Sequence, residues 1–286
     1  MTIRVGVFGA GGRMGATVCQ AVAADGELDL VAAVDPHHEG TTVEGVTIAG
    51  APDALADAGA EVVADFTVLD AARQNLHWLA EHGMHAVVGT TGFSEADLDG
   101  FRAAFTRSNC FLAPNFAIGA VLMMRFAELA APHFETAEII ERHHDLKIDA
   151  PSGTAMRTAE RMAAASGEWG DDPTTKTVVE GARGGVAVGG IHVHSVRLRG
   201  MVAHQEVLLG TQGETLSIRH DSYDRSSFMP GVLLAAKRLF GVAPGRFQAL
   251  RRLDISPLQI GRMHGRTRAQ MQSGLEDRLE HAIHHG

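Results

Sequence analysis

The sequence predicts an α/β protein in which a doubly wound parallel sheet is followed by a second domain of α+β type. Three observations support this prediction. A strand, a glycine turn and a helix open the chain, strands and helices then alternate to about residue 135, and strands with few helices between them follow. Strands joined without crossover helices pair mostly antiparallel, so the second sheet is expected to be open and mostly antiparallel or mixed.

The opening unit has the order that a dinucleotide site needs. A β-branched and aromatic run, residues 3–8, leads into Gly9-Ala-Gly-Gly-Arg-Met-Gly15 and then into apolar residues spaced four apart. Gly9, Gly12 and Gly15 fit a G-x-x-G-x-x-G variant, which allows a tight turn and a close backbone approach to a pyrophosphate. The pattern predicts a Rossmann-like unit, although a purely structural turn is the alternative. The candidate cofactor residues here are Gly9, Ala10, Gly11, Gly12, Arg13 and Met14.

An acidic residue ends the second predicted strand. Residues 28–35 form a mostly apolar run that closes on Asp35, twenty residues beyond Gly15. A carboxylate at this place can accept hydrogen bonds from the adenosine ribose hydroxyls. The alternative is a solvated acid at a strand end.

Further strand ends follow in the same pattern. Residues 61–66 are a third strand, residues 71–81 a helix, and residues 86–88 a strand that enters another glycine turn. Ser94 and Asp97 form a capping-box signal for the next helix. Ligands of doubly wound sheets bind at the carboxyl ends of strands. That rule adds to Asp35 the candidates Gly89, Thr90, Thr91, Ala113, Pro114, Asn115 and Phe116.

Residues 138–155 concentrate the polar chemistry of the chain. His143, His144 and Lys147 come directly before a Pro-Ser-Gly-Thr turn that opens a helix over about residues 154–165. The first amides of a helix favour an anion, and histidine can donate a proton near neutral pH. We therefore predict an anionic-substrate site with a proton donor. A metal site, which the spacing does not favour, and a structural polar patch are the alternatives.

The remaining segments suggest how the chain is divided. Residues 191–199 form an alternating strand with a predicted bulge between Val193 and Val196, and two more strands follow at 205–210 and 214–219. An apolar helix from Pro230 to Phe240 is expected to return to the first domain. We expect a dinucleotide-binding domain of residues 1–135 and about 228–254, a substrate-binding and tetramerisation domain of residues 136–227, and a C-terminal extension of residues 255–286.

Composition excludes several classes of partner. The 286 residues carry 25 Lys and Arg against 34 Asp and Glu, a net charge of −9, so attraction to nucleic acid or to an anionic membrane is not expected. No apolar run is long enough to cross a bilayer, and the N-terminus lacks the features of a signal peptide. Only two cysteines, Cys19 and Cys110, occur, which suits a reducing cytoplasm.

Residues 141–155, Glu-Arg-His-His-Asp-Leu-Lys-Ile-Asp-Ala-Pro-Ser-Gly-Thr-Ala, resemble the signature of the 4-hydroxy-tetrahydrodipicolinate reductase family. That family acts in the diaminopimelate route to lysine. The resemblance covers roughly residues 3–240. Its other motifs are residues 9–15, 88–93, 113–119, 200–207, 213–220 and 225–233. It implies reduction of 4-hydroxy-tetrahydrodipicolinate, a small dicarboxylate, by NADH or NADPH.

The resemblance also implies roles for individual residues. His143 matches the catalytic histidine of the family, and Lys147 matches the catalytic lysine that is described as the proton donor. His144 matches a substrate-binding position, while Gly153 and Thr154 would hold a substrate carboxylate through their amides. The cofactor contacts fall on the strand ends named above. A homotetramer is implied, with the strands of residues 191–219 as the expected interface.

Two features depart from the family pattern. Some members carry an arginine after the ribose-binding acid, but here Pro36-His37-His38 follows Asp35. A lone Asp35 favours NADH by repelling a 2′-phosphate, although Arg13 or protonated His37 could compensate, so the cofactor preference stays open. Residues beyond 254 match nothing in the family pattern. The alternative functions are another two-domain NAD(P)-dependent amino- or keto-acid dehydrogenase and a nicotinamide-binding protein without catalysis.

Overall fold

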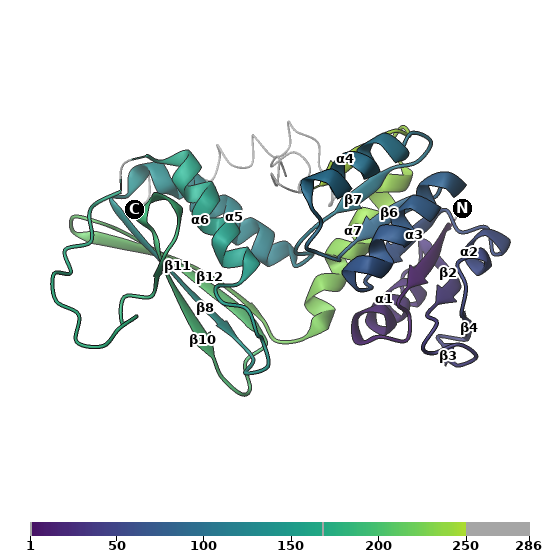
Figure 1. Ribbon diagram of the computed structural model, residues 1–286, viewed down its shortest axis with the longest axis horizontal. Helices are drawn as coiled ribbons and strands as arrows, with labels where there is room; N and C mark the ends of the chain where they lie inside the picture. The colour runs from purple at the N-terminus through teal and green to yellow at the C-terminus, as the bar shows by residue number, and fades with distance from the viewer. Residues whose placement is uncertain (1, 168, 250–286) are drawn as a thin grey trace, which may run out of the picture. The chain divides into compact units, whose positions relative to one another are not determined.

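The computed structural model describes residues 2–167 and 169–249. Its strands form an eight-stranded sheet and a five-stranded sheet (Figure 1). The predicted α/β fold class is confirmed, since the first sheet is parallel apart from one edge pair and the second is mixed. The predicted extension of residues 255–286 lies outside the described residues.

The eight-stranded sheet has the strand order β13-β7-β6-β5-β1-β2-β4-β3. The chain builds outward from β1 in both directions, so the order reverses between β1 and β5, where ligands of such sheets bind. All its pairs are parallel except β3 with β4. The strands are β1 (Ile3–Phe8), β2 (Leu28–Val34), β3 (Thr42–Val43), β4 (Val46–Ala49), β5 (Val62–Asp65), β6 (His85–Val88), β7 (Cys110–Leu112) and β13 (Phe247–Ala249).

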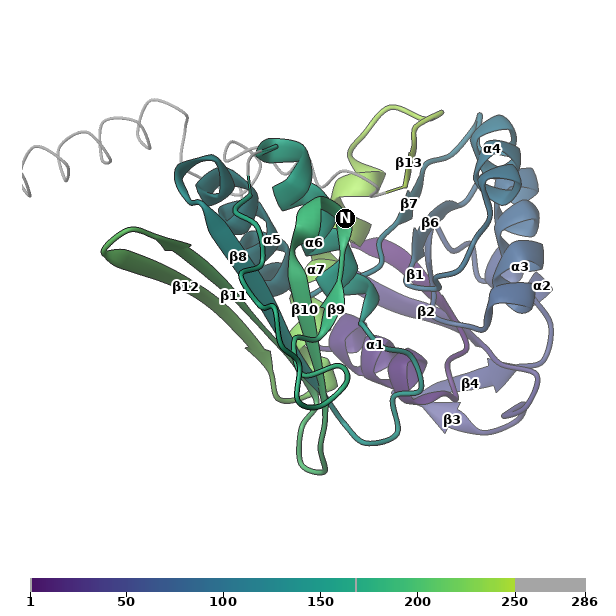
Figure 2. The ribbon, with the colours of Figure 1, turned by 60° about the vertical axis from the view of Figure 1, so that its left-hand side comes forward.

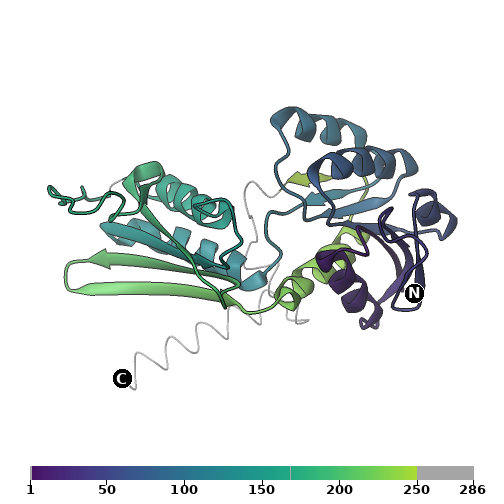
Figure 3. The ribbon, with the colours of Figure 1, turned by 60° about the horizontal axis from the view of Figure 1, so that its bottom comes forward.

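Two pairs of helices cover the faces of this sheet. The helices α1 (Arg13–Ala23) and α7 (Met229–Phe240) contact each other on one face, and α3 (Leu69–His82) contacts α4 (Glu95–Ala104) on the other (Figure 3). The short helix α2 spans Asp53–Asp57 and contacts β2. Helix α7 contacts β5 and β6, and the following strand β13 pairs with β7, so the segment after residue 228 returns to the first sheet.

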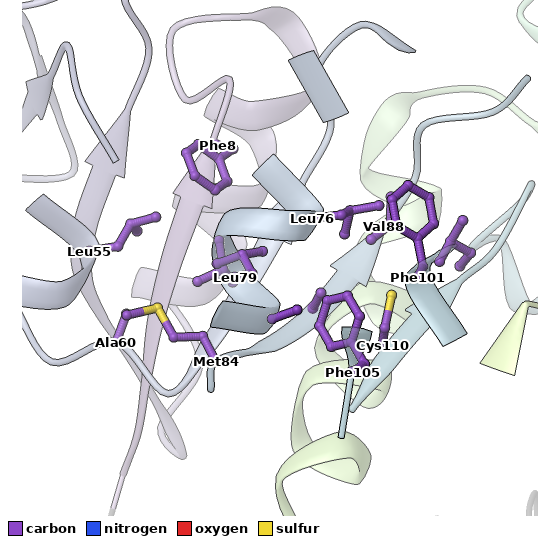
Figure 4. Packing of buried hydrophobic residues seen from close by; sticks show 14 of the residues in the cluster. Phe8, Leu55, Ala60, Leu76, Leu79, Met84, Val88, Phe101, Phe105 and Cys110 are labelled. Atoms are coloured by element: carbon purple, nitrogen blue, oxygen red, sulfur yellow. The ribbon is translucent and has the colours of Figure 1, made fainter. Parts of the chain in front are cut away.

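The core on the α3 and α4 face is built from large apolar side chains. Phe8 on β1, Leu76 and Leu79 on α3, and Phe101 on α4 are each at most 3% exposed (Figure 4). The predicted capping box starts α4, because Ser94 Oγ accepts from the Asp97 amide at 3.2 Å and Asp97 Oδ2 accepts from the Ser94 amide at 2.8 Å.

The five-stranded sheet has β8 at its centre, in the order β12-β11-β8-β10-β9 (Figure 2). Strand β8 runs antiparallel to β11 and parallel to β10. Helices α5 and α6 pack together, and α6 contacts β8. The elements are β8 (Thr136–His143), β9 (Gly185–Val186), β10 (His192–Arg197), β11 (Ala203–Thr211), β12 (Glu214–Ser222), α5 (Ile118–Ala130), α6 (Gly153–Ala165) and the 3-10 turns Ala131–His133, Val188–Gly190 and Arg225–Phe228.

The predicted bulge in β10 is wrong. Strand β10 pairs with β8 in one uninterrupted register from His192 opposite Glu138 to Arg197 opposite His143. The apolar pattern slips because Val196 is 37% exposed, so an apolar residue simply occupies a partly solvated position of a regular strand.

Candidate active site

The turn after β1 forms a backbone cradle at the start of α1. Gly9 has a φ of 71°, and its carbonyl accepts the Gly12 amide at 3.0 Å. Gly12 caps α1 without a side-chain hydrogen bond, so the first amides of the helix meet no capping side chain. A Cβ on Gly15 would lie 1.9 Å from the Gly9 carbonyl oxygen, which shows how closely helix and strand approach. This arrangement fits the pyrophosphate of a dinucleotide.

Asp35 lies beside this cradle and is buried, with 6% exposure. Its Oδ2 accepts the Gly11 amide at 3.1 Å, and its Oδ1 accepts the His37 amide at 3.0 Å. His38 Nδ1 lies 3.0 Å from the same Oδ2. The imidazole of His38 also packs on Gly11, where a Cβ would lie 2.2 Å from its Cγ. The structure therefore brings together the predicted Asp35 and Gly11, and adds His38 rather than the predicted His37 side chain.

Two further predicted strand ends meet around an aromatic residue that sequence reasoning missed. Phe66 directly follows β5, and a Cβ on Gly89 would lie 2.1 Å from its ring. The ring centroid of Phe116 lies 5.6 Å from that of Phe66. Thr90 Oγ1 donates to the Thr67 carbonyl at 2.8 Å. The sequence feature that could have identified Phe66 and Thr67 was their position at the carboxyl end of β5, the strand that pairs with β1.

A direct hydrogen bond joins the predicted cofactor residues to the predicted substrate residues. Asn115, which follows β7, donates from Nδ2 to Thr154 Oγ1 in the first turn of α6 at 3.3 Å. Its Oδ1 accepts the Ala117 amide at 2.8 Å, so the side chain is held at both ends. The strand ends of the first sheet and the N-terminus of α6 are therefore neighbours.

The N-terminus of α6 offers free amides. Ser152 caps the helix, since its Oγ accepts the Ala155 amide at 3.2 Å. The amides of Gly153 and Thr154 precede any helical acceptor. Gly153 is exposed, and no heavy atom lies within 4 Å of a Cβ built on it. A carboxylate can approach both amides from this open side.

His143 ends β8 and pairs with a buried acid. Its Nδ1 lies 2.5 Å from Oε2 of Glu141, a residue with 0% exposure. Arg197 on β10 binds the same carboxylate with both terminal nitrogens, at 2.8 and 2.9 Å. Sequence reasoning missed Glu141 and Arg197. The available signal was the alternation of β8, in which Glu141 shares a face with the buried Ile139.

The pKa of Glu141 reflects competing effects. Burial alone raises the pKa of this carboxyl, but hydrogen bonds from His143, Arg197 and Ser195 outweigh burial and lower the pKa from 4.5 to about 2. The carboxyl is therefore ionised throughout the neutral range.

This lowered pKa predicts an acid-sensitive contribution to stability. The contribution is complete above the ordinary value of 4.5 and is lost as the pH falls toward about 2, because the unfolded chain then binds a proton that the folded chain resists. Urea unfolding at pH 6, 4 and 3 should show a steeper loss of the free energy of unfolding for the native protein than for Glu141→Gln. Parallel losses in the two proteins would contradict the assignment.

Lys147 and His144 do not share the buried acid that pairs with His143. Lys147 Nζ binds both carboxylate oxygens of Asp149, at 2.7 and 2.8 Å, and this hydrogen bond holds the pKa of Asp149 below its usual range. His144 is exposed. Within residues 2–167 and 169–249, no cluster of three His, Cys, Asp or Glu residues is placed to hold a metal ion.

The glycine contact at the start of α1 gives a prediction. Gly15→Ala would force a methyl group against the Gly9 carbonyl, so α1 must move away from β1. We expect a loss of about 1–3 kcal/mol in the free energy of unfolding and roughly tenfold weaker dinucleotide binding. Gly26→Ala is the matched control, since nothing lies within 4 Å of a Cβ at that position. Equal thermal unfolding and dinucleotide binding in the two variants would contradict the close packing.

A doubly wound parallel sheet, with a glycine turn at the start of α1 and an acidic residue beside that turn, is typical of nicotinamide-dependent oxidoreductases. Distant solved structures share this fold, among them an amine dehydrogenase from Mycobacterium smegmatis with a TM-score of 0.59 and 14% identity over 86% of this chain and 94% of that one. The family profile for the dihydrodipicolinate reductase N-terminus matches residues 3–116, and the profile for the C-terminus matches residues 119–253. The chain belongs to the dihydrodipicolinate reductase family.

Similar proteins support this membership along most of the chain. The 4-hydroxy-tetrahydrodipicolinate reductase of Nocardia farcinica is 55% identical over 251 residues, which is 86% of this chain and 96% of the relative. The protein of the same name from Cutibacterium acnes is 52% identical over 82% of this chain and 92% of its own length. A dipicolinate-bound dihydrodipicolinate reductase from Paenisporosarcina sp. TG-14 has a TM-score of 0.77 and 35% identity, covering 88% of this chain and all of that one.

Among the helices of the described residues, none has the length and apolar character needed to span a membrane.

Proposed function

We propose that the protein reduces 4-hydroxy-tetrahydrodipicolinate to tetrahydrodipicolinate with NADH or NADPH, in the diaminopimelate route to lysine. Family membership supports the reaction. The hydrogen bond from Asn115 to Thr154 supports the location, because it joins a strand end suited to the cofactor to the helix with free amides.

The first sheet holds the cofactor in this proposal. The cradle of residues 9–14 receives the pyrophosphate, and Asp35 with His38 lies at the ribose end. When bound, the nicotinamide supplies a hydride. The remaining contacts come from the ends of β6 and β7. They are Gly89, Thr90, Thr91, Ala113, Pro114, Asn115 and Phe116.

The residues around α6 hold the substrate. The amides of Gly153 and Thr154 donate to one carboxylate, and His144 with Lys147 faces the rest of the dianion. The reaction adds one hydride and one proton and removes the hydroxyl as water, so the atoms balance. His143 and Lys147 are the groups that supply and carry the proton.

The wider organisation is proposed on the same basis. Residues 1–135 with about 228–254 form the cofactor domain, and residues 136–227 form the substrate-binding and tetramerisation domain. A homotetramer assembles through the strands of residues 191–219, which mass photometry would detect. We place the protein in the cytoplasm. Its buried cysteines suit a reducing compartment, and burial raises the pKa of Cys19 to about 12.

The pairing of Lys147 with Asp149 gives a prediction. Asp149 is 58% exposed and competes with a substrate carboxylate for the Lys147 ammonium. Asp149→Asn removes the competitor and one negative charge, so we expect a two- to fivefold lower KM for the dicarboxylate, roughly the value of one exposed ion pair. Asp99→Asn, which breaks the surface pair with Arg102 on α4, is the control. A raised KM in Asp149→Asn would show instead that Asp149 positions Lys147 for binding.

The proposed function is tested by following the loss of nicotinamide absorbance with freshly prepared substrate, with NADH and NADPH compared side by side. We expect turnover with at least one of the two cofactors. A panel of amino and keto acids tests for another dehydrogenase activity, and cofactor binding without any turnover would point to a binding protein. Either result, in place of turnover with the dicarboxylate, would overturn the proposal.

A further inference from the structure

The Glu141 carboxylate connects three separate segments of the second sheet region. Its Oε1 accepts the Ser152 amide at 3.1 Å and Arg197 Nη2 at 2.9 Å. Its Oε2 accepts Arg197 Nη1 at 2.8 Å and faces His143 Nδ1 at 2.5 Å. The Ser195 hydroxyl also hydrogen-bonds this carboxylate, so five donors from β8, β10 and the α6 cap surround one fully buried group.

This contact decides which nitrogen of His143 carries a proton. A carboxylate that is ionised at neutral pH accepts a hydrogen bond, so the nitrogen facing it must be Nδ1–H. The neutral ring then has an unprotonated Nε2, and the charged ring has an Nε2–H to give. Within the described ranges 2–167 and 169–249, Nε2 makes no hydrogen bond, so this is the nitrogen available to the substrate.

The same carboxylate relates His143 to the proposed carboxylate-binding turn. The Ser152 amide donates to Glu141, and the Ser152 hydroxyl oxygen accepts the Ala155 amide, so Glu141 holds the residue that caps α6. Arg197 extends the connection, since its Nη2 also donates to the Asp149 carbonyl at 2.6 Å. Asp149 in turn binds Lys147.

We propose that Glu141, held by Arg197, is a positioning residue that fixes the proton-carrying nitrogen of His143 and its alignment with the Gly153 and Thr154 amides. The inference rests on the proposed function, in which His143 carries a proton. A role in stability alone explains the arrangement less well, because a buried ion pair often contributes no more than a well-packed apolar pair. A carboxylate against a ring nitrogen, in contrast, selects a tautomer.

The main test is Glu141→Gln, which keeps the shape and removes the charge. Its amide can donate to Nδ1 and so favour the wrong tautomer. We expect kcat to fall on the order of 10²-fold, below the ~10⁴-fold of a comparable change in a serine protease, while the KM for the cofactor stays unchanged. Glu128→Gln is the control, since Glu128 on α5 forms its ion pair with Arg161 on α6 and not with His143. It should retain the native kcat.

Two readouts separate positioning from a structural role. In a His143→Ala background, Glu141→Gln should cost less than about threefold in kcat, because the ring that it orients is gone. In ¹⁵N-histidine spectra, the His143 signals, assigned by their loss in His143→Ala, should report the Nδ1–H tautomer in the native protein and a mixture in Glu141→Gln. If Glu141→Gln does not fold, Glu141→Gln with Arg197→Met removes both charges of the pair and takes its place.

The outcomes distinguish this inference from the proposed function. An inactive native protein overturns the proposed function, and with it the inference. If the native protein is active, the inference is overturned by a His143→Ala protein that keeps the native kcat, by an undiminished kcat in Glu141→Gln, by an equal loss of kcat in the native and His143→Ala backgrounds, or by an unchanged tautomer.

Discussion

Lys147→Ala is expected to lower kcat on the order of 10²-fold or more. Lys147 is the only lysine before residue 176, and its ammonium lies in the turn between His143 and the α6 N-terminus. Removing it takes away both a positive charge that attracts the dicarboxylate and a group that can deliver a proton. Steady-state kinetics with the preferred cofactor measure the loss, and the exposed Lys176→Ala should leave kcat unchanged.

Lys147→Arg separates these two contributions. Arginine keeps the positive charge, but a guanidinium does not release its proton at working pH. We expect Lys147→Arg to retain much of the native KM for the dicarboxylate and to lose kcat as Lys147→Ala does. A native kcat in both variants would remove Lys147 from the chemical step.

His143→Ala is expected to have an effect of similar size, about 10²-fold on kcat. The side chain is 15% exposed, so it lies at the edge of the buried Glu141 cluster, where it can reach both substrate and protein. General acid–base groups contribute about 10²- to 10⁴-fold. Cofactor binding, measured by fluorescence titration, should change little, since His143 belongs to the second sheet.

His133→Ala is the matched control for this variant, because His133 is an exposed histidine in the 3-10 turn after α5. It should leave kcat and KM near their native values. A His143→Ala protein that keeps more than half of the native kcat would assign the proton to another group.

Local patterns predicted much of the fold. The strand, glycine turn and helix at residues 3–23 follow from short-range chemistry, because glycine spacing and apolar periodicity act within one or two turns of chain. The helix expected over residues 154–165 begins at Gly153, one residue earlier, where Ser152 supplies the cap. The return of the apolar helix from Pro230 to Phe240 was likewise predicted, from its alanine and leucine content, and α7 contacts β5 and β6.

Contacts between distant residues were not predictable in this way. Arg197 lies 56 residues from Glu141, and only the parallel pairing of β10 with β8 brings them together. Strand β13 joins the sheet beside β7 for the same reason, since no local signal identifies the partner of a three-residue strand. The alternation of β8 could have indicated an acid at position 141 on the buried face, but not its partner.

The turn after β2 decides which of the two histidines, His37 or His38, lies beside the Asp35 carboxylate. The His38 amide donates to the Asp35 carbonyl at 3.1 Å, and this turn brings the His38 ring back to the Asp35 carboxylate. The sequence shows only that two histidines follow, and it favoured His37. Such turns are set by a few backbone angles that residue types in this segment leave open.

The most direct test of the account uses a cofactor carrying deuterium in place of both hydrogens at nicotinamide C4. The product formed by the native protein from 4-hydroxy-tetrahydrodipicolinate should be one mass unit heavier than the product from unlabelled cofactor, and His143→Ala and Lys147→Ala should form it far more slowly. Product without the label, no product with either NADH or NADPH, or undiminished formation in both variants would contradict a hydride delivered from the first sheet to a substrate protonated at the end of β8.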